Sequence, residues 1–266
     1  MSSHVPEVEA GYVEGLFSLA GKVALVTGGG SGLGEAIALG FMQAGATVVI
    51  ADINEEGANA LLESVADRPN PPTFVPVDVT SRKSIDALVE DVVGRLGRID
   101  ILVNSAGTAA RHVAEDFPED VWDRVIAINL KGTFMCCQAV GRTMLAQGSG
   151  SIINIASIGG SIAYPHTTAY LQSKGAVAQM TRSLALEWID RGVRVNAIAP
   201  SLFDTPLVRM NDSQKSYTSE FIMLRTPIGR KGQPYEVVGP AIFLASDAAA
   251  MVVGHVLQVD GGYLIA

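Results

Sequence analysis

Short apolar runs rich in β-branched residues alternate with longer stretches of helical period from Lys22 to the end of the chain. Strands are predicted at Val23–Thr27, Thr47–Ala51, Thr73–Val77, Ile99–Val103, Ser151–Ile155, Val193–Ala199 and His255–Val259. Helices predicted between them include Leu33–Ala44, Ile85–Leu96, Val121–Leu145, Thr168–Ile189 and Glu236–Ala245. Strands that alternate with helices of this length form βαβ units, whose right-handed crossovers give a parallel sheet covered on both faces. The pattern therefore predicts an α/β fold, a doubly wound sheet of seven parallel strands in a single domain.

Two segments depart from this alternation. Residues 1–19 form an acidic arm without a clear period, which leaves residues 20–266 as the domain. Residues 201–230 follow a strand and mix polar residues with Pro206 and Pro227. A connection of this length is uncommon in a compact domain and is typical of a lid or binding loop. A short peripheral pair of helices is the alternative, but ligands of open α/β sheets bind at the carboxyl ends of the strands, which favours a lid.

Composition narrows the classes of function. Of 266 residues, 48% are hydrophobic and 17% are charged, which excludes a disordered chain. The net charge of −8 disfavours binding to nucleic acid or to an anionic membrane. Cys136 and Cys137 are adjacent and the four histidines are scattered, so no disulfide framework or metal site is predicted. The first twenty residues contain no Lys or Arg and no apolar run could span a bilayer, so a cytoplasmic protein is expected.

A glycine-rich loop follows the first predicted strand directly. It reads Thr27-Gly28-Gly29-Gly30-Ser31-Gly32-Leu33-Gly34, and a helix begins there. Glycine lets a backbone turn tightly and approach a pyrophosphate, which then meets free N–H groups at the helix N-terminus. The strand and helix on either side are the context that a dinucleotide-binding loop requires.

Asp52 ends the second predicted strand. An acid at this place can accept hydrogen bonds from the ribose hydroxyls of an adenosine and would repel a 2′-phosphate. No basic residue in the loop or at Ile53 could hold that phosphate, so NAD is predicted rather than NADP. The alternative role for Asp52, or for Asn54, is to cap the helix that begins near Glu55.

Four further residues form a candidate catalytic group. Tyr170 and Lys174 lie at positions i and i+4, on one face of a predicted helix. A nearby ammonium lowers the pKa of a phenol, which would make Tyr170 a proton donor and acceptor for an alcohol/ketone pair. Ser157 follows a buried strand, where its hydroxyl can reach the same edge of the sheet. Asn129 stands in an apolar stretch of the long predicted helix, where a buried amide needs partners.

The motifs occur in a fixed order: Thr27-Gly28-x3-Gly32-x-Gly34, Asp78, Asn104-Ser105-Ala106-Gly107, Asn129, Ser157, Tyr170-x3-Lys174, Pro200 and Val259-Asp260-Gly261-Gly262. In this order and spacing the chain resembles the short-chain dehydrogenase/reductase family over nearly all of residues 21–266. The resemblance implies a Rossmann-like fold, hydride transfer between a nicotinamide cofactor and a secondary alcohol or ketone, and a homotetramer. Several stretches look most like polyol and sugar-acid dehydrogenases, such as gluconate 5-dehydrogenase and galactitol dehydrogenase.

The resemblance also implies roles for individual residues. Tyr170 would be the acid/base and Lys174 would hold the nicotinamide ribose. Ser157 would bind the substrate oxygen, and Asn129 would hold a water that links Lys174 to solvent. Asp78 and Val79 would frame the adenine. The full set of expected cofactor residues is Gly28, Ser31, Gly32, Leu33, Gly34, Asp52, Ile53, Asp78, Val79, Asn104, Ala106, Gly107, Tyr170, Lys174, Pro200, Phe203 and Thr205.

The chain departs from the family pattern in a few places. Ser105 stands where a second Asn is usual, Ser201 where Gly is usual, and Phe203 where a smaller branched residue is common. Ser201 is expected to stiffen the loop over the nicotinamide and to narrow the choice of substrate.

The expected substrate residues are Ser157, Tyr170, Arg111, Tyr164 and His166. Arg111 could grip a carboxylate or phosphate, or it could be a solvated cation near Glu115 and Asp116. Two other functions remain open, an NADP-linked ketoreductase and a non-catalytic nucleotide-sensing protein on the same fold.

Overall fold

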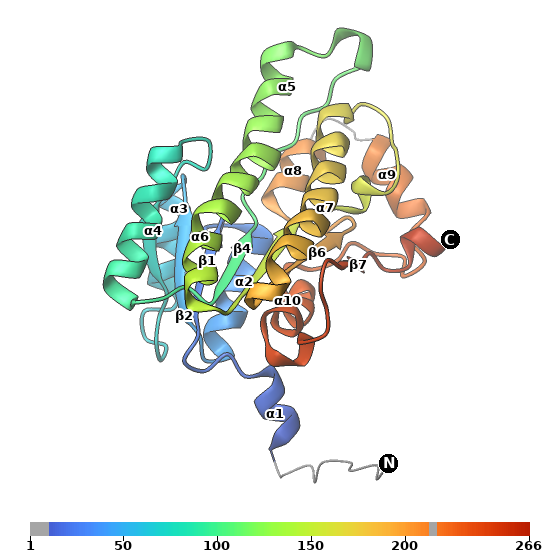
Figure 1. The fold of residues 1–266 in the computed structure, drawn as a ribbon. Helices are drawn as coiled ribbons and strands as arrows, with labels where there is room; N and C mark the ends of the chain where they lie inside the picture. The colour runs from blue at the N-terminus through green and yellow to red at the C-terminus, as the bar shows by residue number, and fades with distance from the viewer. Residues whose placement is uncertain (1–10, 213–216) are drawn as a thin grey trace.

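A parallel sheet of seven strands, in the order β3-β2-β1-β4-β5-β6-β7, forms the centre of the molecule (Figure 1). The computed structural model describes residues 11–212 and 217–266. The strands are β1 (Val23–Thr27), β2 (Thr47–Asp52), β3 (Thr73–Pro76), β4 (Ile101–Asn104), β5 (Gly150–Ile155), β6 (Val193–Pro200) and β7 (Val256–Val259). The strand order reverses between β1 and β4, which opens a crevice at their carboxyl ends. The predicted α/β fold with seven parallel strands is confirmed.

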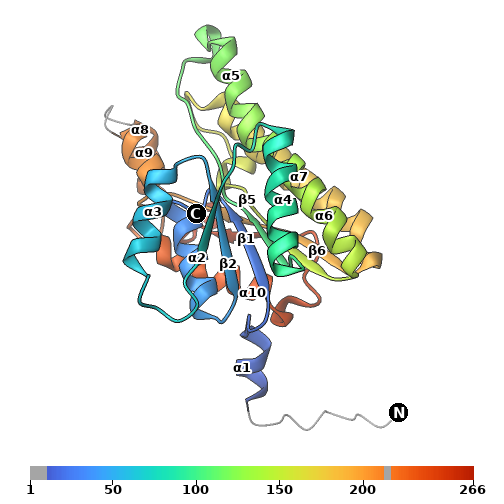
Figure 2. The same cartoon turned by 90° about the vertical axis from the view of Figure 1, so that its left-hand side faces the viewer.

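Helices pack on both faces of this sheet (Figure 2). The helices are α1 (Tyr12–Phe17), α2 (Gly32–Gln43), α3 (Glu55–Ser64), α4 (Arg82–Leu96), α5 (Glu119–Ile126), α6 (Thr133–Gln147), α7 (Thr168–Trp188), α8 (Pro206–Asp212), α9 (Tyr217–Leu224) and α10 (Val238–Ala245). Alternate residues of β1 face opposite layers: Val26 packs with α2, α3 and α10, whereas Leu25 packs with α4, α6 and α7. Two apolar cores therefore hold the strand ends rigidly in place.

The long helix predicted over residues 121–145 is interrupted. A π-helical turn, Ala127–Gly132, separates α5 from α6. The apolar period of the sequence continues through this turn and does not reveal it. A π-helical turn widens the backbone hydrogen-bond pattern by one residue and does not change the residue types. The turn contains Asn129, which is fully buried.

The two irregular segments contain helices. The expected arm includes α1, which was not predicted, and its last residue, Leu19, is fully buried in the core, so the domain begins before residue 20. Residues 1–10 of the expected arm lie outside the described part of the chain. The segment 201–230 contains α8 and α9, as the alternative of a helix pair predicted. Both helices lie at the carboxyl edge of the sheet (Figure 1).

Candidate active site

The glycine loop after β1 has no room for side chains. Gly28 has φ +66°, and a Cβ there would lie 2.5 Å from the backbone nitrogen of Ala106. A Cβ at Gly34 would collide with the carbonyl of Gly28, so this glycine lets α2 pack against the loop. Ser31 precedes the first turn of α2, and its side chain makes no capping hydrogen bond there. The first turn of α2 therefore has no side-chain cap at Ser31, and Gly32 and Leu33 of this turn line the cleft, where free N–H groups can bind an anion.

Asp52 joins the glycine loop to the end of β2. Its Oδ2 accepts a hydrogen bond of 2.9 Å from the N–H of Gly30, and its Oδ1 accepts one of 2.9 Å from the N–H of Asn54. Asn54, not Asp52, caps α3, because its side chain accepts from the N–H of Gly57 at 3.1 Å. Asp52 is half-buried at the crevice, which leaves its carboxylate available to a ligand.

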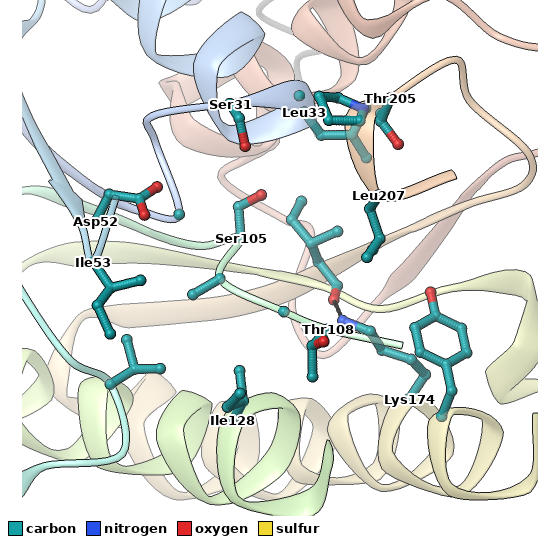
Figure 3. Close-up of a pocket in the computed structure, with 18 of the residues that line it drawn as sticks. Ser31, Leu33, Asp52, Ile53, Ser105, Thr108, Ile128, Lys174, Thr205 and Leu207 are labelled. Carbon is teal, nitrogen blue, oxygen red and sulfur yellow. Dashed lines mark hydrogen bonds between the residues drawn. The ribbon is translucent and has the colours of Figure 1, made fainter. Parts of the chain in front are cut away.

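A cleft of about 520 Å³ runs along the carboxyl ends of the strands. Asp52 and Ile53 lie at one end and Lys174 at the other, with Ser105 and Thr108 between them (Figure 3). The expected cofactor residues that line it are Gly28, Ser31, Gly32, Leu33, Asp52, Ile53, Asp78, Val79, Ala106, Gly107, Tyr170, Lys174, Pro200, Phe203 and Thr205. The fold therefore brings together most of the residues selected from the sequence.

Two expected cofactor residues do not line the cleft. Gly34 lies behind the loop, as described above. Asn104 is buried in register with Asn154 of β5, and its Nδ2 donates to the Oδ1 of Asn154 at 2.9 Å. Asn154 in turn donates to Thr181 of α7 at 3.0 Å. Asn104 therefore tethers the β4 end to β5 and α7.

Lys174 is buried at the inner end of the cleft. Its Nζ donates a hydrogen bond of 2.7 Å to the main-chain oxygen of Ile155 (Figure 3). Burial lowers the pKa of this ammonium from 10.5 to about 8. The nitrogen lies 5.9 Å from the centre of the Tyr170 ring.

The sequence predicts that Lys174 lowers the pKa of Tyr170, but in this structure the pKa of Tyr170 is raised. Burial raises the pKa of the Tyr170 phenol, and a polar interaction with the hydroxyl of Ser157 opposes that rise. The cause is the burial of the phenol itself, while the nearby ammonium donates its hydrogen bond to a carbonyl oxygen.

Asn129 connects the cleft wall to the catalytic helix. Its Oδ1 accepts from the N–H of Thr108 at 2.8 Å, and its Nδ2 donates to the oxygen of Thr108 at 2.9 Å. The same Nδ2 donates to Ser173 Oγ at 3.0 Å, and Ser173 donates to the oxygen of Tyr170 at 2.7 Å. This amide therefore fixes the loop at residues 105–108 relative to α7.

Of the expected substrate residues, only Tyr170 lines the cleft, whereas Ser157, Arg111, Tyr164 and His166 do not. Ser157 is 6% exposed, and its Oγ accepts from the N–H of Gly159 at 3.1 Å. The charges of Arg111 and Tyr170 both act on Tyr164, which places the three side chains near one another. The side chain of His166 is exposed, contrary to the expectation that it lines the pocket. Its main-chain oxygen instead accepts from the N–H of His112 at 3.0 Å.

Sequence reasoning missed a group of residues in the cleft wall. These are Val77, Thr80, Ser105, Thr108, Arg124, Ile128, Ile155, Ala156, Ser201, Pro206, Leu207 and Val208. Most adjoin an expected site residue at a strand end, so their position after a strand was the available signal. Arg124 and Ile128 come from α5 and the π turn, and no local pattern in the sequence indicates that these elements reach over the cleft.

The described part of the chain contains neither a metal-binding group nor a membrane-spanning helix. Residues 11–212 and 217–266 contain no group of His, Cys, Asp and Glu side chains that could hold a metal ion. No helix within those ranges is long and apolar enough to span a membrane.

The fold and the motifs agree with comparisons to known proteins. Residues 28–264 match a family described as enoyl-(acyl carrier protein) reductase. The chain is 43% identical to a D-threitol dehydrogenase from Mycolicibacterium smegmatis, over 94% of this chain and 95% of that protein. It is 41% identical to an NAD-dependent glycerol dehydrogenase from Listeria innocua, over 94% of this chain and 96% of that protein.

A solved structure extends the likeness to the whole fold. The gluconate 5-dehydrogenase from Burkholderia cenocepacia, in complex with NADP and tartrate, is 39% identical with a TM-score of 0.90. The match covers 96% of this chain and 99% of that chain. The chain belongs to the short-chain dehydrogenase/reductase family, and it is an oxidoreductase that interconverts alcohol and ketone groups with a nicotinamide cofactor.

Proposed function

We propose that this protein oxidises a secondary alcohol of a polyol, sugar acid or related hydroxy compound with NAD, or carries out the reverse reduction. The observation that carries the proposal is a single cleft with Asp52 at one end and Tyr170 with Lys174 at the other. A cleft of about 520 Å³ suits an extended dinucleotide rather than a small metabolite alone.

The residues of the cleft fit a dinucleotide. The glycine loop and the N-terminus of α2 would hold the pyrophosphate, because a Cβ at Gly28 would meet the backbone and no side chain blocks the approach. Asp52 would accept hydrogen bonds from the adenosine ribose, while Asp78 and Val79 would line the adenine. Lys174 would hold the nicotinamide ribose at the inner end of the cleft. The bound cofactor supplies the hydride acceptor or donor and, when oxidised, a positive charge.

The chain itself supplies the proton transfer. Tyr170 would take the proton from the carbinol oxygen in oxidation and return it in reduction. Ser157, whose hydroxyl interacts with the phenol, would hold the substrate oxygen beside it. Asn129 would keep Thr108 and α7 in place while this occurs. A nucleotide sensor would need none of these groups, so their assembly at one site favours an enzyme.

Cofactor preference separates this proposal from its alternative, an NADP-linked ketoreductase. The gluconate 5-dehydrogenase structure contains NADP, whereas the glycerol dehydrogenase is named as NAD-dependent. In this chain the carboxylate of Asp52 would face the 2′-phosphate without a cation in the glycine loop. Asp52 therefore favours NAD.

A substrate screen tests the proposed function directly. Polyols, sugar acids, cyclic alcohols and aromatic alcohols are offered with NAD and with NADP, and the absorbance of the reduced nicotinamide is followed. We expect turnover of at least one hydroxy compound with NAD. Failure to oxidise every alcohol and to reduce the matching ketones would contradict the proposal.

We further propose that the protein is a cytoplasmic homotetramer. Leu186 of α7 is 80% exposed and Phe134 of α6 is 40% exposed, which supports a subunit interface over these helices. Cys136 and Cys137 are both buried free thiols, which suits a reducing compartment. Light scattering after size-exclusion chromatography tests the assembly, and cell fractionation tests the location.

A further inference from the structure

A second phenol lies at the reacting centre. Tyr164 stands between the short helix Ile158–Gly160 and α7, and the hydroxyl of Ser157 interacts with this phenol as it does with Tyr170. A Cβ at Gly159 would lie 2.9 Å from Tyr164 Oη and 3.4 Å from Ser157 Oγ. Gly159 therefore leaves the space in which the two oxygens come near each other.

The surroundings of Tyr164 hold its ring in place. The ring packs with an apolar cluster that contains Ile158, Ile222 and Tyr263. The main-chain oxygen of Tyr164 accepts from Thr167 Oγ1 at 3.2 Å. Two residues further on, His166 has φ +66°, a strained value for a residue with a side chain. Such strain persists where the structure around it is over-determined, and it is concentrated at functional sites.

The environment of Tyr164 keeps its phenol in the neutral, protonated form. Burial raises the pKa of the phenol strongly, and the positive charge of Arg111 only partly opposes the rise. The group therefore stays protonated near neutral pH and can both donate and accept a hydrogen bond. The side chain of Tyr164 is half-buried, which leaves part of it accessible.

We propose that Tyr164 binds a hydroxyl on the carbon next to the reacting carbinol carbon, so that the enzyme selects vicinal diols and the matching hydroxyketones. This inference rests on the proposed function. The hydroxyl oxygens of a vicinal diol lie about one hydrogen-bond length apart, ~2.8 Å. One of these two oxygens would lie between Tyr170 and Ser157. The other would then meet the phenol of Tyr164, which is beside Ser157. Tyr164 is thus a specificity-determining residue, not the acid/base.

A substrate without the second hydroxyl would lose the hydrogen bond to Tyr164, and the phenol would keep only Ser157 as its partner. Loss of one hydrogen bond corresponds to a loss of about 10-fold in kcat/KM. Cyclohexanol and the vicinal cyclohexanediols differ only in that hydroxyl. The monomethyl ether of the diol keeps an acceptor oxygen and loses the donor, with a bulkier group in place of the hydrogen.

The test measures kcat/KM for these compounds with the unaltered protein, Tyr164→Phe and Tyr235→Phe. Tyr235 is 70% exposed and far from the reacting groups, so its variant is the matched control. We expect the unaltered protein and the control to favour a diol over cyclohexanol by about 10-fold. Tyr164→Phe should lose this preference, because its kcat/KM falls more for the diol than for cyclohexanol.

Each of the other outcomes contradicts this inference alone or together with the proposed function. If Tyr164 only orients Ser157, the variant loses kcat equally for cyclohexanol and the diol, and the unchanged ratio overturns the inference. Equal kcat/KM for the two compounds in the unaltered protein overturns it without a variant and leaves the proposed function intact. Absence of turnover with every alcohol and ketone overturns the proposed function and this inference together.

Discussion

The ammonium of Lys174 and the main-chain oxygen of Ile155 form a buried hydrogen bond of 2.7 Å, at the point where β5 ends beside the catalytic helix. A carbonyl oxygen satisfies one of the three N–H groups and does not neutralise the charge. Desolvation therefore lowers the pKa of Lys174 from 10.5 to about 8. The free energy of unfolding therefore contains a pH-dependent contribution from Lys174.

We predict that Lys174 makes a contribution to stability without cofactor that rises between pH 8 and 10.5. In that window Lys174 binds more protons in the unfolded chain than in the folded one, so for this group a higher pH favours the folded state. Below pH 8 the cost of the buried charge is fully present. Relative to Lys174→Met, the unaltered protein should gain up to about 3 kcal/mol across the window.

Denaturant titrations of the two proteins at a series of pH values measure this difference. Lys83→Met is the matched control, because Lys83 is exposed on α4 and its substitution should leave the pH dependence unchanged. A difference between the unaltered protein and Lys174→Met that stays constant with pH would show that the ammonium keeps its ordinary pKa.

We expect Tyr170→Phe to abolish turnover while the cofactor still binds. The phenol is the group placed to exchange a proton with the carbinol oxygen, and loss of general acid/base catalysis costs at least about 10²-fold in kcat. Cofactor affinity comes mainly from the glycine loop and Asp52, so calorimetry should give a dissociation constant close to that of the unaltered protein. Near-normal turnover in the variant would remove Tyr170 from the mechanism.

Cofactor preference should depend on the charge of Asp52. We expect the unaltered protein to favour NAD over NADP by about 10²-fold or more in kcat/KM, because the carboxylate repels the 2′-phosphate. Asp52→Asn removes the charge and keeps one of the two acceptor oxygens that receive the N–H groups of Gly30 and Asn54, so it should narrow the gap with only partial loss of these loop contacts. Asp52→Ser or Asp52→Ala should narrow it too, with weaker binding of both cofactors.

Kinetics with both cofactors measure this preference, and Asp67→Asn on the exposed surface is the control. Equal use of NAD and NADP by the unaltered protein would contradict the assignment of Asp52 to the adenosine ribose.

The sequence predicted the parallel sheet well because β1, β2, β4, β5 and β6 are largely buried and read as apolar runs. Position after such a run then located Asp52 and Ser157. The glycine loop was equally readable, since steric exclusion at Gly28 leaves no other residue type possible.

Relations between distant elements could not be read in the same way. The pairing of Asn104 with Asn154 depends on the register of β4 against β5, which no local pattern encodes. The π turn around Asn129 and the carbonyl that faces Lys174 are backbone features. For this reason the burial of Asn129 was expected correctly, whereas the direction of the Tyr170 pKa shift was not.

Residues 201–212 and 217–230 are expected to close over bound ligands. Thr205 packs close to the start of α2, since a Cβ at Gly32 would lie 3.5 Å from its Cβ. Leu207 and Val208 of α8 line the cleft as well. Helices as short as α8 and α9 depend on tertiary contacts for their stability, so they open readily when the cleft holds no ligand.

Closure would exclude water from the path of the hydride and complete the substrate pocket. Hydrogen exchange is measured without ligand, with NAD, and with NAD plus a product analogue. Amide protection in α8 and α9 should increase with each addition, while buried β5 stays equally protected throughout and serves as the internal control. Strong and unchanged protection of the two helices in all three states would mean that they form a rigid wall, and substrate choice would then depend on fixed side chains such as Tyr164 and Arg111.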